Sequence, residues 1–177
     1  MELQGFLAEA LGQYRRYKEY AERAAAQVSD EDFFRTLDPE STSIAVIMKH
    51  LAGNHRSRWR DFLTSDGEKP DRRRDGEFQV HDEGRPAIEA RWQEAWQITF
   101  ESLESLSEGD LQRTITIRGE PHSVLQAVAR NLTHLAYHVG QIVWLARHFA
   151  GPSWQTLSIP RGKSEEYNRR VWGGGAK

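Results

Sequence analysis

The sequence contains no cysteine among its 177 residues. This absence excludes a disulfide framework, and it also excludes a metal site built from thiolates. Any metal that the chain binds must therefore be held by nitrogen and oxygen atoms.

A strong net charge and a long apolar run are also missing. The chain has 24 Lys+Arg and 26 Asp+Glu, a net charge of -2, so no overall field attracts nucleic acid or an anionic membrane. Residues 1–5 do not begin a targeting signal, and no apolar stretch is long enough to span a bilayer. We expect a cytoplasmic protein with no nucleic-acid or membrane partner. Its length suits one domain over residues 1–172, with residues 173–177 disordered.

Helical periodicity is the main feature that the sequence does contain. Apolar residues recur at three- and four-residue steps in four segments. One of Ser41, Thr42 and Ser43 can cap the second segment, Pro86 suits the first turn of the third, and Gly151 stops the fourth. The predicted helices span about residues 2–27, 41–65, 86–107 and 123–151. Between the last two, residues 113–120 alternate polar with β-branched side chains, which predicts a short strand or extended arm.

This pattern predicts an all-α protein, a four-helix bundle with a long loop between helices two and three and an extended C-terminal tail. The loop, residues 65–85, is long for a compact domain. The tail carries apolar side chains among polar ones, so we expect it to pack back onto the bundle. These side chains are Trp154, Leu157, Ile159, Tyr167 and Trp172.

The residues most suggestive of chemistry are His134 and His138. Four residues apart on a helix, they lie on one face, where both imidazoles can reach a common metal ion. His50, midway along the second predicted helix, is the candidate for a third ligand. Such a site would suit zinc or nickel, with a fourth position open to water. A hydrogen-bonded core pair is the simpler alternative.

The other histidines extend this site poorly. His55 faces another side of its helix, and His148 lies more than two turns beyond His138. We expect these two, and His81 and His122, to be structural or solvated.

The order of these motifs resembles a known family. A histidine in helix two, a long connection and His-x-x-x-His in helix four are similar to the DinB/YfiT-like superfamily of metal-binding four-helix bundles, which includes thiol-dependent transferases. The resemblance covers about residues 3–149. Residues 75–78 (DGEF) and 154–164 resemble a branch known only as a domain of unknown function. The resemblance implies that His50, His134 and His138 bind the metal.

The sequence leaves three kinds of function open. The first is a metal-dependent enzyme that acts by thiol S-transfer, with a low-molecular-weight thiol as cosubstrate, or by hydrolysis. The second is a non-catalytic metal-binding protein, such as a sensor or store, and the third is a bundle whose histidines merely pack. No Glu or Asp stands beside the histidines in the sequence as a general base. Asn54 and Gln141 are candidates to orient the ligands or a bound water.

Other features receive structural interpretations. Trp59, Trp92, Trp96 and Trp144 occur at helical spacing and are expected in the core or at the interface of a homodimer. Residues 72–74, three arginines flanked by aspartates, are interpreted as a solvated loop cluster. At least one of two segments, residues 69–78 and 154–164, is expected to cover the open side of the metal.

Overall fold

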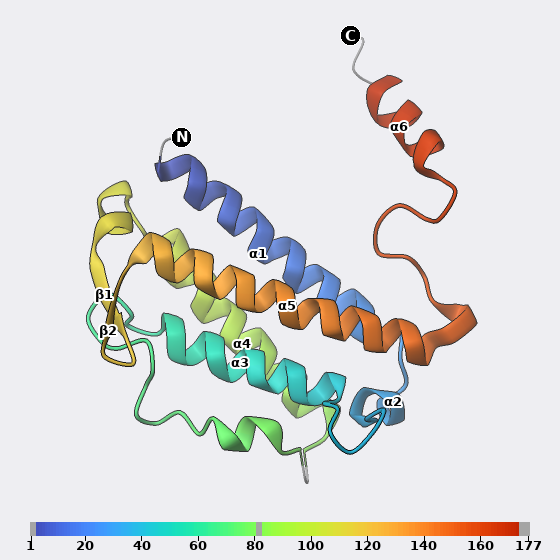
Figure 1. Ribbon diagram of the computed structural model, residues 1–177, viewed down its shortest axis with the longest axis horizontal. Helices are drawn as coiled ribbons and strands as arrows, with labels where there is room; N and C mark the ends of the chain where they lie inside the picture. Colours follow the sequence, from blue (N-terminus) through green and yellow to red (C-terminus); the bar gives the residue numbers. More distant parts are fainter. Residues whose placement is uncertain (1–2, 81–82, 174–177) are drawn as a thin grey trace.

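The computed structural model describes residues 3–80 and 83–173 and is mostly helical (Figure 1). His81 and residues 174–177 lie outside this range. No helix in the part of the chain described has the length and apolar character needed to cross a membrane. The α-helices are α1 (Leu3–Ala25), α2 (Asp30–Phe34), α3 (Ile44–Trp59), α4 (Arg85–Glu104), α5 (Val124–Ala150) and α6 (Ser164–Gly173), and strands β1 (Thr114–Ile117) and β2 (Glu120–Ser123) form one hairpin.

Local signals determine where the long helices begin and end. Ser43 caps α3 by accepting a hydrogen bond from the Val46 N–H, and Ser123 begins α5 in a capping box with Gln126. Gly151 ends α5 at a positive φ of 53°, a conformation that favours glycine. The second predicted helix is too long, because α3 ends at Trp59 and residues 60–64 form a turn.

The four long helices lie side by side (Figure 1). α3 packs against α4 and α1 packs against α5, while further contacts join α3 to α5 and α1 to α4. Trp59, Trp92 and Trp96 are buried in the core between them, as predicted, whereas Trp144 on α5 is 59% exposed. The side by side arrangement brings the middle of α3 opposite the middle of α5.

Strand β1 confirms the predicted strand, and the β-hairpin contacts the segment that follows α3. Ile117 pairs with Glu120 next to a tight turn at residues 118–119. The Asp66 carboxylate accepts hydrogen bonds from the backbone N–H groups of Arg118 and Gly119, each at 2.8 Å. This contact fixes the start of the long loop against the hairpin.

The C-terminal tail packs only in its first part. Trp154 and Leu157 lie against the core, and the backbone of Gln155 exchanges hydrogen bonds with the Gln27 side chain. After a turn at Gly162, α6 stands away from the long helices (Figure 1) and has no buried residue. The prediction of packing is therefore wrong for Ile159, Tyr167 and Trp172, which are exposed. Their few apolar side chains bury too little surface to hold α6.

Candidate metal centre

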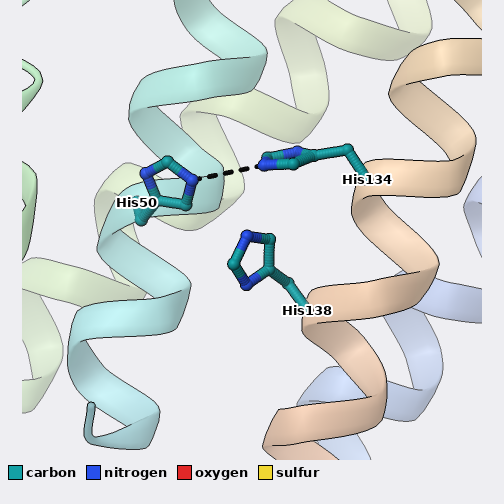
Figure 2. A group of neighbouring side chains, drawn as sticks. All are labelled: His50, His134 and His138. Atoms are coloured by element: carbon teal, nitrogen blue, oxygen red, sulfur yellow. Dashed lines mark hydrogen bonds between the residues drawn. The ribbon is translucent and has the colours of Figure 1, made fainter. Parts of the chain in front are cut away.

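Three histidines converge in the gap between α3 and α5 (Figure 2). His50 projects from α3, and His134 and His138 project from successive turns of α5. One ring nitrogen from each lies within 4.8 Å of the others. His50 is buried and the other two are half-buried. The structure thus brings together the three residues that the sequence analysis selected.

The spacing of two of these nitrogens suits a common metal ion. His50 Nε2 and His134 Nε2 lie 3.3 Å apart. A tetrahedral zinc with Zn–N distances of about 2.0–2.1 Å separates two ligand nitrogens by about 3.3 Å. The same pair is also within hydrogen-bonding distance. The third ring, His138, has its centroid 5.0 Å from that of His50 and 4.6 Å from that of His134, so the arrangement is a triangle and more than a hydrogen-bonded pair.

Two of the three rings are oriented by hydrogen bonds on the nitrogen that faces away from the cluster. His50 Nδ1–H donates to Glu77 Oε2 at 2.9 Å, and His138 Nδ1–H donates to Gln141 Oε1 at 2.9 Å. Each bond places the proton on Nδ1 and leaves the Nε2 lone pair free to bind a metal. His134 Nδ1 is buried and has no partner among the described residues, so no hydrogen bond on that nitrogen orients the ring.

Glu77 is the functional residue that the sequence analysis missed. It lies in the short 3₁₀-helix η1 (Asp75–Phe78), part of the long loop, and contacts α3 from outside the helix pair. Burial would raise the pKa of the Glu77 carboxyl, but hydrogen bonds from His50 and Arg72 outweigh it and lower that pKa below its usual value. Glu77 is therefore ionised and accepts a hydrogen bond from His50 Nδ1–H, so a carboxylate that is distant in the sequence lies beside this histidine.

Arg72 holds Glu77 in place with two hydrogen bonds. Its Nε donates to Glu77 Oε1 and its Nη2 donates to Oε2, both at 2.8 Å, and its Nη1 donates to Glu68 Oε2 at 3.0 Å. The Arg72 and Glu77 side chains are only 5% and 8% exposed. The prediction of a solvated arginine cluster is therefore wrong for Arg72, while Arg73 and Arg74 are exposed.

Gly53 of α3 makes room for this ion pair. A Cβ atom on Gly53 would lie 2.2 Å from Glu77 Oε1, which is an impossible contact. Glycine in the interior of a helix weakens it by roughly 0.5–1 kcal/mol relative to alanine. The close approach of the carboxylate is the structural reason for a glycine at this position.

The other candidate residues take different positions. Asn54 lines the cavity beside the histidines, and its Oδ1 accepts a hydrogen bond from Asn131 at 3.0 Å. His55 is buried in the core, where its Nδ1–H donates to Thr99 Oγ1 at 3.1 Å. His148 is exposed and stacks on Trp144, and His122 lies in β2. None of these three histidines joins the cluster.

The loop between α3 and α4 forms one wall of a cavity that opens at the histidines. The cavity has a volume of about 290 Å³, and Arg72, Arg74 and Phe78 from the loop line it. The Phe78 ring lies against His50, with centroids 4.8 Å apart. Residues 69–78 thus line part of this cavity, and their covering of the open side of a bound metal stays a prediction. Residues 154–164 contribute nothing to the lining within the part of the chain described.

His134 and His138 are neutral near physiological pH. Burial, together with the smaller effects of the neighbouring His138 and His50, lowers the pKa of His134 to about 4. Burial also lowers the pKa of His138, although its bond to Gln141 opposes the shift. Neutral imidazole is the form that binds a metal, so protons compete with a metal only under acidic conditions.

The same shifts predict how stability depends on pH. His134 and His55 have a usual pKa of 6.5, which burial lowers in the folded protein to about 4 and about 3. Below pH 6.5 the unfolded chain therefore takes up protons that the folded protein does not, and stability falls as the pH falls.

We expect the metal-free protein to lose roughly 3 kcal/mol between pH 7 and pH 5. Urea unfolding at several pH values measures this loss. His134→Gln should reduce the slope and His148→Gln should not, and equal slopes in all three proteins would contradict the assignment.

The fold and the cluster define a mostly helical protein with three converging histidines. The chain belongs to a family described as proteins of unknown function (DUF1572), whose family profile matches residues 2–163. No curated protein and no solved structure matches the chain.

Proposed function

We propose that this chain is a four-helix bundle of the DinB/YfiT-like type that binds one divalent transition metal, zinc or nickel, through His50, His134 and His138. The observation that carries the proposal is the convergence of three ring nitrogens within 4.8 Å, two of them on rings oriented by hydrogen bonds to Glu77 and Gln141. A ligating histidine whose second nitrogen donates to a carboxylate is a common arrangement in metal sites.

We further propose that the centre serves an enzyme that acts by thiol S-transfer or hydrolysis. A bound divalent metal lowers the pKa of a thiol or water at its open position and so supplies a nucleophile. The chain has no cysteine, so a thiol would come from a low-molecular-weight cosubstrate. Both oxygens of Glu77 are bonded to His50 and Arg72, which leaves this carboxylate as a positioning residue and not a general base. S-transfer suits this arrangement better, because a metal-bound thiol needs no separate base.

A non-catalytic role, as a metal sensor or store, is the alternative. Cobalt-substituted protein distinguishes the two, because a thiolate bound to cobalt gives a charge-transfer absorption band. We expect such a band with small thiols, followed by consumption of the thiol when an alkyl halide is added. If neither thiol binding nor hydrolysis of activated esters is detected in protein that holds stoichiometric metal, the alternative replaces the enzyme proposal.

We also propose a homodimer formed by α5 outside the metal site. Tyr137 and Trp144 project from this helix and are 65% and 59% exposed. Large aromatic side chains on one helix are typical of interfaces. Sedimentation should show a dimer at micromolar concentration, and Trp144→Glu should convert it to the 20.4 kDa monomer. A wild-type monomer would remove this proposal.

A further inference from the structure

The cavity at the three histidines is strongly basic. Arg58, Arg72, Arg74, Arg118 and Arg130 all line it, and no carboxylate does among the described residues. They come from α3, the long loop, the hairpin and α5, so four separate parts of the chain each contribute positive charge to one cavity.

Most of this charge is not neutralised by the protein. Among the described residues, Glu77 and Glu68 are the acids that reach these arginines, and both bond to Arg72. Glu68 also lies 3.5 Å from Arg118. Within residues 3–80 and 83–173, no ion pair involves Arg58, Arg74 or Arg130. The cavity therefore holds an excess of positive charge.

Arg58 is the most unusual of these side chains. It is only 8% exposed, and its Nη1 atom is buried with no hydrogen-bond partner in the described structure. Burial and the charge of Arg130 lower the pKa of Arg58 to about 10, so its guanidinium still carries a charge at neutral pH. A buried guanidinium N–H that makes no hydrogen bond is unfavourable, because it has lost its hydration without a replacement. An arginine that served packing alone would be expected to donate to nearby carbonyl groups, and no such bond is present in the described structure.

We infer that this cavity binds an anionic ligand, whose carboxylate or phosphoryl oxygens accept hydrogen bonds from Arg58 and Arg130. Guanidinium groups recognise both kinds of oxyanion. The volume of about 290 Å³ suits a small organic molecule. If the anionic ligand is the substrate, this inference rests on the proposed metal centre. The anionic end of the substrate would then lie among the arginines, and another group of the same molecule would face the histidines.

Titration calorimetry on the metal-free protein tests the anion site separately from the metal. The probes are inorganic phosphate and succinate, which distinguish a phosphoryl from a carboxylate ligand. We expect at least one of them to bind. Arg58→Gln and the exposed Arg130→Gln should each weaken binding by about tenfold or more, because each removes a charge-assisted contact. Arg147→Gln, on the outside of α5, makes the same charge change away from the cavity and should leave binding unchanged.

Two results would overturn the inference: no binding of either anion at low ionic strength, or equal weakening by Arg130→Gln and Arg147→Gln. Arg130→Gln keeps the test decisive if Arg58→Gln fails to fold. Repeating the titration after zinc is added separates the two proposals. If the wild-type protein binds phosphate or succinate but takes up no zinc, the proposed metal centre is wrong and the anion site still stands.

Discussion

His134→Ala and His138→Ala should each abolish stoichiometric binding of a divalent metal. Each change removes one of three imidazoles that converge within 4.8 Å, and two remaining histidines hold zinc or nickel far more weakly. His148→Ala removes a histidine from the same helix, outside the cluster, and should bind one metal per chain like the wild type. Elemental analysis after dialysis against a metal buffer measures the stoichiometry.

Circular dichroism is the control for these three variants. His134 and His138 are half-buried, His148 is exposed and the core does not depend on them, so all three proteins should stay helical, as should the wild type after chelation. The metal should add only the stabilisation that its binding to the folded state provides. A full complement of metal in either cluster variant would show that the ligands lie elsewhere.

Glu77→Gln should weaken metal binding by about 10- to 100-fold while His50 remains in place. The neutral amide favours the proton on His50 Nδ1 less strongly than the carboxylate does, and it leaves the buried Arg72 guanidinium without a full charge partner. Breaking a buried pair on one side typically costs about 3–5 kcal/mol. We therefore also expect a lower free energy of unfolding in the metal-free protein. Competition with a chelator of known affinity measures the first effect and urea unfolding the second.

Glu68→Gln is the matched control for Glu77→Gln. Glu68 also accepts a hydrogen bond from Arg72, but it does not touch a histidine. Its side chain is 23% exposed, so the loss of its charge should cost less stability. Metal affinity should stay close to the wild-type value. If both variants weaken metal binding equally, Glu77 acts through the stability of the loop and not through His50.

The helices could be predicted from the sequence because their signals are local. Ser43 and Ser123 begin α3 and α5, and Gly151 ends α5, through contacts within a few residues. The end of α3 was harder to predict, because Phe62 keeps the apolar spacing of the helix while it enters the core from a turn. The position of α6 depends on whether its apolar side chains meet a surface to pack on, which spacing alone does not reveal.

The three histidines were predictable for a similar reason. The four-residue spacing of His134 and His138 places them on one face of a helix, and His50 lies at the middle of a neighbouring helix. Glu77 was not predictable from spacing, because its contact with His50 depends on the path of a long irregular loop. The available signal was the motif at residues 75–78 in a loop too long to be a simple connection. The gathering of arginines at the cavity likewise requires the tertiary fold.

X-ray absorption spectroscopy of protein loaded with one zinc per chain tests the central claim most directly. Absorption at the zinc edge reports the type, number and distance of the atoms around the metal. The proposed metal centre predicts three imidazole nitrogens at about 2.0–2.1 Å, with one further light atom at the open position. In His138→Ala, any residual zinc should show fewer imidazoles. A zinc site dominated by carboxylate oxygens, or a wild-type protein that takes up no metal, would contradict the account.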